Sequence, residues 1–423
     1  MASFLFCRYF AKLAVHANTT SMISAQEAYQ IVMQHSLQPK VIELPLNEAQ
    51  GHVLQESIFA DRDFPPFDRV SMDGIAYQFE QAGQQERFAV EGQQMAGSPV
   101  MRLQNADACL EVMTGAMLPE NTDTVTRYED VEFFEENGQS YARLMVKPDK
   151  KGQNVHARGM DEKEGTELLK AGRLLGPAEI AVAASVGKHI LKVSMRPSIG
   201  IISTGDELVD IDQQPEPYQI RRSNTYALQA ALLQMGILAD MYHLADDKLT
   251  IQAGMEEALT KHDVLILSGG VSKGKKDYVP AVLEGLGMEK LFHRVKQKPG
   301  KPFWFGKNIN DKVVFALPGN PVSTFMCFNR YFRPWLMRSM GTEESPLYYA
   351  KLTAGIKFPP PITYFMQVKL NSDQDGTLLA TPYEGQGSGD FANLLACDAF
   401  MMLPDDKSDF KAGEVYPVVV YRG

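Results

Sequence analysis

The sequence has 423 residues, 44% of them hydrophobic and 22% charged, the balance of a globular protein with room for about three domains. Its 42 basic and 52 acidic side chains give a formal net charge of -10 and a pI near 5.4, which argues against a general binder of nucleic acids or anionic membranes. The four cysteines lie far apart without a CxxC pair, so neither a zinc knuckle nor a disulfide framework is indicated, and a reducing cytoplasm fits best.

The first 21 residues differ from the rest of the chain. They carry Arg8 and Lys12, and no acidic residue comes before Glu27. The segment loosely resembles a targeting peptide, but these charges interrupt its apolar stretch. We therefore expect residues 1–21 to be a disordered extension, and the folded protein to begin near Met22, where SAQEAYQIVMQHS has the pattern of a capped helix.

Three stretches with different patterns come next. Residues 41–165 contain short β-rich runs and many turns, which predicts one or two β-rich modules. Residues 196–340 alternate apolar strands with helical segments, which predicts an open, mostly parallel sheet. Residues 347–423 return to short alternating strands and predict a small β-barrel. The predicted fold class is therefore α/β plus β-rich modules in a multidomain chain.

Polar motifs follow directly after the apolar strands of the α/β segment. The carboxyl ends of parallel strands meet at one edge of a sheet, and ligands bind at that edge, so we expect these residues to gather around one site. They are Ser203, Thr204, Gly205, Asp206, Glu207, Asp246, Asp247, Ser268, Gly269, Gly270, Pro318, Gly319, Asn320 and Pro321.

The same segment holds a local concentration of positive charge. Residues 290–310 include six basic residues and no Asp or Glu. In an extended strand Arg294, Lys296 and Lys298 would share a face before the Pro-Gly turn that leads to Lys301. This arrangement suits a small or multiply charged anion. The alternative is a solvated strand edge that lysines protect against aggregation.

The stretch SGGVSKGKKDY (residues 268–278) matches the spacing of a phosphate-binding P-loop at Gly269, Gly274 and Lys275. Lys276 stands where a P-loop has the Ser or Thr that binds magnesium, so the sequence does not indicate a P-loop nucleotidase. What remains is a glycine turn that can approach a phosphate or a pterin closely. A plain strand-to-helix turn is the alternative.

Five carboxylates follow the predicted strands, namely Asp206, Glu207, Asp246, Asp247 and Asp277. Hard oxygen ligands bind Mg²⁺, and lysines bind the phosphate or oxyanion that accompanies it, so the combination suggests phosphoryl or adenylyl chemistry. Helix capping is the alternative for Asp247, which precedes KLTIQAG, and for Glu207 near a turn.

Six motifs occur in order along the chain: FDRVSMDGIA (67–76), VMTGAMLP (112–119), STGDEL (203–208), SGGVSxGxxDY (268–278), KPGKPFWFGK (298–307) and LPGNPVS (317–323). Together they resemble the motifs of the molybdopterin molybdenumtransferase family, which includes MoeA and the gephyrin E domain. The resemblance runs from about Met22 to the C-terminus, and QGSGDFANLL (386–395) extends it into the last module. Any one motif is weak evidence, whereas six in this order are specific.

The resemblance implies an elongated homodimer of four-domain chains. Its catalytic cleft would lie between the α/β domain of one subunit and the inserted β domain of its partner. The implied domains are a linking and dimerisation domain with the N-terminal helix (22–59 and 166–195), an inserted β domain (60–165), an α/β molybdopterin-binding domain (196–346) and a C-terminal β-barrel (347–423).

The implied reaction takes adenylated molybdopterin and molybdate and, with Mg²⁺, releases AMP and forms molybdenum cofactor. A molybdopterin adenylyltransferase upstream and molybdoenzyme acceptors downstream would be its protein partners. Neither a nucleic acid nor a membrane is implied.

The resemblance also implies roles for individual residues. The expected catalytic residues are Asp73, Thr114, Glu207, Asp246, Asp277, Arg294, Lys298 and Lys301. Those expected to bind the pterin nucleotide or the oxyanion are Thr204, Gly205, Asp206, Gly269, Gly270, Ser272, Pro318, Gly319, Asn320, Pro321 and Ser323. Mg²⁺ would be held by Glu207, Asp246 and Asp277.

The sequence departs from the family pattern in two places. Arg221 and Arg222 stand where the family often has an acidic residue before Ser-Asn, and Thr363 and Gln367 occupy a segment in which the family commonly carries an arginine. Two alternatives remain. A stand-alone molybdopterin adenylyltransferase would share the α/β signature but lack the other modules, and a non-catalytic, gephyrin-like scaffold would not need the acidic residues.

Overall fold

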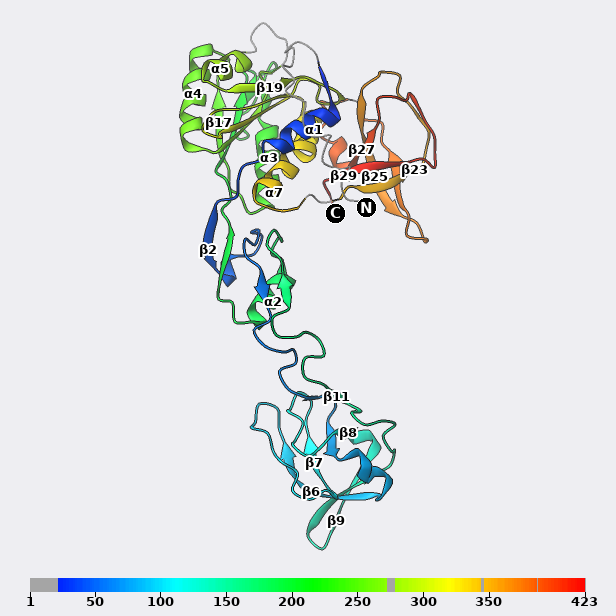
Figure 1. Cartoon of the computed structure of the whole chain (residues 1–423). Helices are drawn as coiled ribbons and strands as arrows, with labels where there is room; N and C mark the ends of the chain where they lie inside the picture. The colour runs from blue at the N-terminus through cyan, green and yellow to red at the C-terminus, as the bar shows by residue number, and fades with distance from the viewer. Residues whose placement is uncertain (1–21, 272–277, 344–345, 386, 423) are drawn as a thin grey trace, which may run out of the picture.

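The computed structural model describes residues 22–271, 278–343, 346–385 and 387–422. The expected N-terminal extension, Ser272 and Asp277 therefore lie outside the described residues. The described chain is elongated, with a β domain at one end and an α/β domain beside a β-barrel at the other (Figure 1). A small linking unit that contains α2 (Pro177–Ser185) lies between these ends. The predicted fold class is confirmed.

A six-stranded sheet forms the centre of the α/β domain, in the order β17-β14-β18-β22-β21-β19. Its strands are β14 (Ile199–Thr204), β17 (Asp240–Leu244), β18 (Val264–Ser268), β19 (Glu289–His293), β21 (Trp304–Lys307) and β22 (Val313–Leu317). The first four in spatial order are parallel, and β21 and β19 extend the sheet with antiparallel pairs. β14, β18 and β22 are buried throughout, as expected for strands covered on both faces.

Helices cover both faces of this sheet because neighbouring side chains of a strand point to opposite faces. Ile201 packs in one core with α1, α3, α6 and α7, whereas Ile202 packs in another with α4 and α5. The helices are α1 (Ala25–Gln34), α3 (Ser223–Leu233), α4 (Lys248–Lys261), α5 (Val279–Gly285), α6 (Pro321–Cys327) and α7 (Arg333–Ser339), and the π-helical segment η4 (Phe328–Phe332) joins the last two. α1 begins, as predicted, with a capping box between Ser24 and Glu27.

The C-terminal segment forms a closed barrel. Its five strands are β23 (Tyr348–Leu352), β25 (Thr363–Ser372), β26 (Leu378–Pro382), β27 (Ala399–Leu403) and β29 (Val415–Val420), and pairing of β25 with β27 closes the ring. Met366, Val368 and Met401 belong to its core. Outside the ring are β24 (Ile356–Lys357), β28 (Asp409–Phe410) and α8 (Asn393–Ala396).

Two further strands join the barrel to the rest of the chain. β20 (Val295–Lys298) pairs with β25 on one side and with β1 (Ile23–Ser24) on the other. The lysine-rich strand is therefore an interior strand of a seven-stranded sheet, and its interpretation as a sheet edge is wrong.

The inserted domain at the far end is a six-stranded sheet in the order β8-β5-β7-β6-β10-β9. Its elements are β5 (Gly74–Tyr77), η2 (Phe79–Gly83), β6 (Arg87–Gln94), β7 (Ala108–Val112), β8 (Thr124–Arg127), η3 (Tyr128–Asp130), β9 (Val131–Glu136) and β10 (Gln139–Leu144), with the pair β4 (Arg69–Val70) and β11 (Val155–His156) beside them. Ile75, Phe88 and Cys109 lie in its own core.

The linking unit is built from two passes of the chain. The outgoing pass contributes β2 (Val41–Pro45), η1 (Leu46–Glu48) and β3 (Ile58–Phe59), and the returning pass contributes β12 (Glu167–Leu169), α2 and β13 (Ile190–Ser194). β2 pairs with β13 and β3 with β12, both antiparallel. Across the described parts of the chain, no helix combines the length and apolar character needed to cross a bilayer.

Candidate functional site

A pocket of about 240 Å³ opens where the parallel strands of the α/β domain end. It is lined by the ends of β14 and β18, the loop after β22 and the first turn of α3. The sequence-predicted residues in its lining are Thr204, Glu207, Gly269, Gly319, Asn320 and Pro321. These residues come from separate motifs, so the fold brings three of the predicted polar segments to one place.

Other predicted residues lie outside this lining. Gly205, Asp206, Asp246, Gly270, Arg294, Lys298, Lys301, Pro318 and Ser323 are in the α/β segment but do not line the pocket. Ser323 is buried within α6. Asp73 and Thr114 belong to the inserted domain, at the opposite end of the chain (Figure 1). Within one chain the predicted residues therefore form two separate groups.

Asn224 connects the walls of the pocket, and the sequence analysis did not single it out. Its Nδ2 donates to Ser268 Oγ at 2.9 Å and to the carbonyl oxygen of Gly319 at 2.7 Å. Because a carbonyl oxygen only accepts, this contact fixes the orientation of the amide. A longer contact of 3.4 Å reaches Thr324 Oγ1. Asn224 thus ties α3 to the end of β18 and to the loop after β22.

The glycine turn after β18 comes very close to its neighbours. Gly270 has a φ of +69°, and a Cβ there would lie 2.6 Å from Val279 Cγ2 and 2.8 Å from Thr204 Oγ1. Gly269 has a φ of +104°, and a Cβ there would lie 3.1 Å from the carbonyl oxygen of Thr204. Only glycine fits both the backbone conformation and the space, so this turn is more than a flexible connection.

The carboxylates differ in their contacts. Asp206 Oδ1 accepts from the backbone N–H of Asp246 at 3.0 Å, and the Glu207 carboxylate lies against Gly205. Asp247 accepts from the N–H groups of Leu249 and Thr250 at the start of α4, and its hydrogen bonds with Thr250 and then Leu249 lower the pKa of its carboxyl. The capping alternative is therefore correct for Asp247.

No group of three or more His, Cys, Asp and Glu side chains suited to a metal ion occurs among the described residues. Asp277, the third expected ligand, lies outside them. Mg²⁺ is commonly held by one or two carboxylates together with substrate phosphates, and the hard oxygens of Glu207 and Asp246 fit that requirement.

The basic strand β20 alternates as predicted, with Val295 and Gln297 buried and Lys296 and Lys298 exposed. Gly300 follows with a φ of +87°, and a Cβ there would lie 2.7 Å from Cys327 Sγ. The turn after the strand is thus fixed by close packing against α6.

The Lys298 ammonium lies over two aromatic rings of the barrel segment. Its Nζ is 5.4 Å from the centroid of Phe358 and 5.7 Å from that of Tyr364. The two rings stack on each other at 4.3 Å. Lys298 also pairs in register with Tyr364, next to Thr363, so the segment without the family's arginine adjoins this lysine.

In the inserted domain the MDG and MTG motifs meet. The backbone N–H and the hydroxyl of Thr114 both donate to Asp73 Oδ1, at 2.6 and 2.7 Å. These hydrogen bonds, the backbone one first, lower the pKa of the Asp73 carboxyl. Both residues are exposed, so a charged carboxylate faces solvent at this end of the chain.

Ser388 is a second residue that the sequence analysis did not single out, although its motif was noticed. Its Oγ accepts from Asn320 Nδ2 at 2.9 Å, and its carbonyl oxygen accepts from the N–H of Val322 at 3.1 Å. The barrel segment thereby reaches the loop that lines the pocket. Ser388 could have been found only from the motif QGSGDFANLL, because this stretch has no helix or strand pattern that points to the residue.

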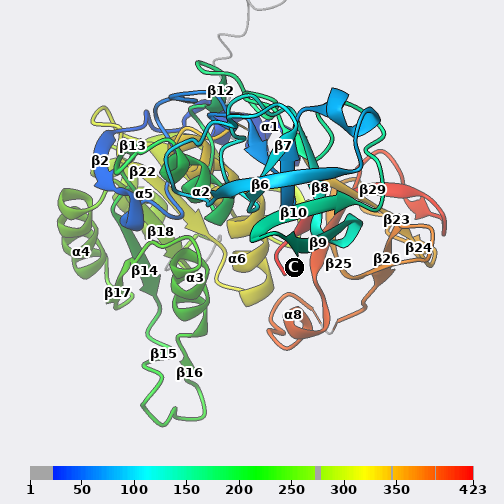
Figure 2. The same ribbon diagram turned by 90° about the horizontal axis from the view of Figure 1, so that it is seen from below.

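The two arginines that depart from the family pattern have partners nearby. Arg222 forms an ion pair of 2.5 Å with Asp210, which also accepts from Tyr226. Arg221 donates from Nε to the carbonyl oxygen of Gln213 at 3.2 Å. Arg221 ends β16 (Ile220–Arg221), which pairs in parallel with β15 (Leu208–Val209), and Arg222 follows it; Figure 2 shows this projecting segment extending beyond the sheet. The positive charge of Arg222 is thus largely balanced within the segment.

Comparison with known proteins covers almost the whole described chain. Three family models match: the MoeA N-terminal region (domain I and II) over residues 23–187, the probable molybdopterin binding domain over 200–338 and the MoeA C-terminal region (domain IV) over 349–421. Two relatives named molybdopterin molybdenumtransferase are 40% identical over 399 residues (Synechocystis sp., 94% of this chain and 99% of the relative) and 32% identical over 410 residues (Bacillus subtilis, 95% and 94%).

A solved structure agrees with these matches. The crystal structure of a molybdopterin biosynthesis MoeA protein from Pyrococcus horikoshii has a TM-score of 0.78 and 27% identity, and the match covers 95% of this chain and 100% of that one. The similarity includes the inserted domain and the barrel as well as the α/β domain. The chain therefore belongs to the molybdopterin molybdenumtransferase family, the family of MoeA.

Proposed function

We propose that this protein inserts molybdate into adenylated molybdopterin, releasing AMP and forming molybdenum cofactor. The observation that carries the proposal is the pocket at the ends of β14, β18 and β22, where a glycine turn with no room for side chains meets the loop of the PGNP motif. Such a turn lets backbone N–H groups approach phosphate oxygens closely. Two relatives that match over 94% and 95% of this chain are named molybdopterin molybdenumtransferase.

Two groups of residues would bind the two substrates. The pocket would hold the pterin nucleotide, while Lys298 and Lys301, both exposed and on either side of the Pro-Gly turn, would bind molybdate. Phe358 and Tyr364 hold the Lys298 ammonium over their rings. A covalent enzyme nucleophile is not required, because a molybdate oxygen or water can attack the activated phosphate.

We propose that Mg²⁺ takes part, held by Glu207, Asp246 and Asp277 together with the pyrophosphate of the substrate. When bound, it would neutralise charge on the leaving AMP. A carboxylate on its own would repel the substrate, so the presence of Glu207 in the lining of the pocket favours a cation between it and the phosphate oxygens.

We also propose that the working enzyme is a homodimer in the cytoplasm. Asp73 and Thr114 lie at the far end of the chain from the pocket, so a site that uses both groups must take one of them from a second chain (Figure 1). Three cysteines of the described chain, Cys109, Cys327 and Cys397, are free and buried, which is consistent with a reducing compartment. An adenylyltransferase would supply the substrate, and molybdoenzymes would accept the product.

The central test is incubation with adenylated molybdopterin, Mg²⁺ and molybdate, with AMP release as the measurement. We expect molybdate-dependent release, and an intact nucleotide would indicate a scaffold. Mixed dimers test the shared site: Asp73→Ala and Glu207→Ala chains should be inactive alone and recover activity at one cleft when combined. Properly formed mixed dimers without any activity would refute a cleft built from two chains.

A further inference from the structure

Lys298 is exposed, yet its ammonium group has a defined place in the structure. The Nζ atom lies 5.4 Å from the ring centroid of Phe358 and 5.7 Å from that of Tyr364. The two rings, which we call the ring pair, are stacked with their centroids 4.3 Å apart and their planes at 18°. A cation within about 6 Å of a ring centroid is attracted by the negative face of the ring. The ring pair therefore favours one direction of a side chain that would otherwise move through solvent.

The barrel keeps the ring pair itself in place. Phe358 is 7% exposed and belongs to the barrel core, and Tyr364 packs against that core. The backbone of Tyr364 is paired in register with Leu403 on one side and with Lys298 on the other. The lysine and the tyrosine thus lie on neighbouring strands, and the packed barrel holds the rings whether or not the ammonium moves.

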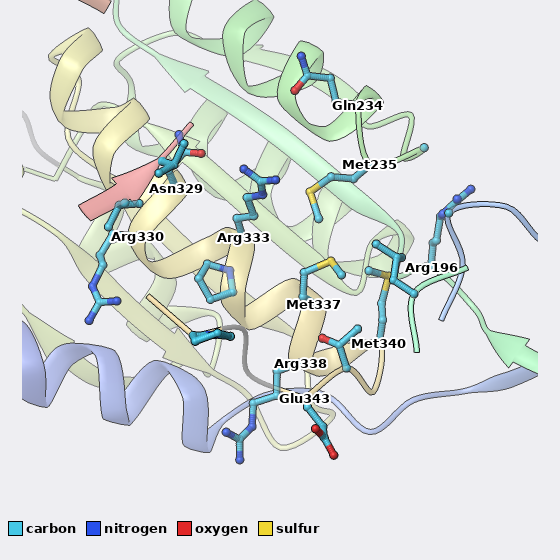
Figure 3. Close-up of a pocket in the computed structure, with 18 of the residues that line it drawn as sticks. Arg196, Gln234, Met235, Asn329, Arg330, Arg333, Met337, Arg338, Met340 and Glu343 are labelled. Atoms are coloured by element: carbon cyan, nitrogen blue, oxygen red, sulfur yellow. The ribbon is translucent and has the colours of Figure 1, made fainter. Parts of the chain in front are cut away.

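A second cation over a ring shows what distinguishes Lys298. Arg330, labelled in Figure 3, has its Cζ 3.8 Å from the ring centroid of Tyr29. Arg330 is only 4% exposed, so the surrounding chain encloses its charge. Lys298, in contrast, is exposed, and no carboxylate of the described chain forms an ion pair with it. Its ammonium is thus both held in place and accessible to an anion.

The ring pair lies at a departure from the family pattern. Tyr364 follows Thr363, in the segment that carries Thr363 and Gln367 where the family commonly has an arginine. An oxyanion beside this segment would not meet that guanidinium, so the nearby lysines must balance more of its charge. An unrestrained lysine is poorly suited to this, because ordering its long side chain opposes binding. A lysine that is already held loses less entropy when the anion arrives.

We propose that Phe358 and Tyr364 are positioning residues, which hold the Lys298 ammonium where it meets the oxyanion and so offset the missing arginine. An ammonium group has three donors, and the ring faces lie on one side of it, so N–H groups remain for the oxygens of molybdate. The proposal rests on the proposed function, in which Lys298 binds molybdate. The opposite arrangement is one in which the rings and the anion compete for the ammonium.

The KM for molybdate in the AMP-release assay tests the proposal. Tyr364→Leu removes one ring and should raise this KM about two- to fivefold, the loss expected for a cation over one exposed ring. The kcat at saturating molybdate should stay the same, because the reacting groups remain. Tyr364→Phe keeps a ring at this position and should retain the wild-type KM. Tyr364→Leu combined with Phe358→Leu should raise the KM about tenfold.

Phe410→Leu is the matched control for Phe358→Leu. Phe410 is a fully buried core residue of the same barrel, and its ring centroid lies 5.7 Å from the Lys407 ammonium. Its removal should weaken the barrel in the same way without changing the KM for molybdate, and urea unfolding shows which variants are folded. Tyr364 is only partly buried, so Tyr364→Leu should fold even if Phe358→Leu does not.

A second measurement does not depend on turnover. Lysines methylated with ¹³C-formaldehyde keep their positive charge, and the ring currents of Phe358 and Tyr364 should displace the Lys298 methyl signal upfield in an NMR spectrum. Lys298→Arg identifies this signal by its absence. Tyr364→Leu should move the signal toward the ordinary lysine position, whereas Tyr364→Phe should not. Addition of molybdate to the wild-type protein should shift the signal as well.

An unchanged KM in folded Tyr364→Leu would overturn the proposal, and so would a lower KM, because the rings would then compete with the anion. Equal rises in KM for Tyr364→Phe and Tyr364→Leu would overturn it too, since the hydroxyl and not the ring would matter. Wild-type protein that releases no AMP would refute the proposed function, and the methyl signal would then decide on the ring pair. Absence of a shift with molybdate would overturn the positioning role, whereas a shift that Tyr364→Leu weakens would support it.

Discussion

Replacement of Asn224 by aspartate should weaken the protein even though the two side chains have nearly the same shape. Asn224 is the second residue of α3, and a negative charge in the first turn of a helix ordinarily stabilises it by about 0.3 to 1 kcal/mol. Here the side chain donates to Ser268 Oγ and to the Gly319 carbonyl oxygen, at 2.9 and 2.7 Å; the serine hydroxyl could donate to a carboxylate instead, but the carbonyl oxygen can only accept. A carboxylate cannot donate, and one of its oxygens would face that carbonyl oxygen.

The magnitude follows from the lost hydrogen bond to Gly319. This bond contributes about 1 kcal/mol, and the unpaired carbonyl oxygen with a charge against it adds about 1 more, so after the gain at the helix start the net destabilisation should be about 1 to 2 kcal/mol. Asn224→Ala loses the bonds without the repulsion and should cost about 2 kcal/mol. Lowering the pH should reduce the difference in the free energy of unfolding between Asn224→Asp and wild type, because a protonated carboxyl can donate a hydrogen bond again.

Urea unfolding followed by tryptophan fluorescence suits this test, because Trp304 and Trp335 both lie in the cores of the α/β domain. AMP release measured in parallel should fall for both variants, since the same hydrogen bonds hold the pocket walls together. If Asn224→Asp had an unfolding midpoint equal to or above that of wild type, the favourable charge in the first turn of α3 would outweigh the loss of the Asn224 hydrogen bonds. Our account of the pocket would then be wrong.

Three further predictions concern other parts of the chain. Lys298→Ala should raise the KM for molybdate about tenfold or more in the AMP-release assay, whereas Lys261→Ala, on the outer surface of α4, should not. Gly300→Ala should lower stability by about 2 to 4 kcal/mol in urea unfolding, because of its φ of +87° and its approach to Cys327; a wild-type midpoint would refute this. The Lys407 ammonium, through its hydrogen bond, lowers the pKa of Glu414 from 4.5 to about 2, so the carboxylate stabilises the barrel above about pH 4.5 and this contribution disappears as the pH falls through about 2. In thermal unfolding at several pH values, the melting temperature of Glu414→Gln should fall less than that of wild type as the pH decreases. Equal falls in the two proteins would contradict the contribution of this carboxylate to stability.

The sequence predicted the fold where local pattern decides it. The alternating strands and helices of residues 196–340 specify an open sheet, and the capping box at Ser24 fixes the start of α1, because both depend on neighbours within a few residues. The gathering of polar motifs at one edge followed from the parallel order of the strands. The resemblance to a family added the identities of modules whose short strands have little pattern of their own.

Contacts between distant segments were not predictable in this way. Asn224 meets Gly319 and Ser388 meets Asn320 across long stretches of sequence, and nothing in the local pattern of either residue indicates its partner. The basic strand could be assigned to one face of an extended segment, but its place between β1 and β25 depends on a strand at each end of the protein.

The two passes of chain through the linking unit have a consequence for synthesis on the ribosome. β2 leaves the exit tunnel early, but its partner β13 follows only after more than a hundred further residues have been translated. During that interval the inserted domain, which has its own core, can fold first, while β2 waits without a partner. At about 5 to 20 residues per second the exposed strand waits for several seconds or longer. Nascent chains of this protein should therefore depend on chaperones most strongly while the inserted domain is being made, well before the α/β domain exists.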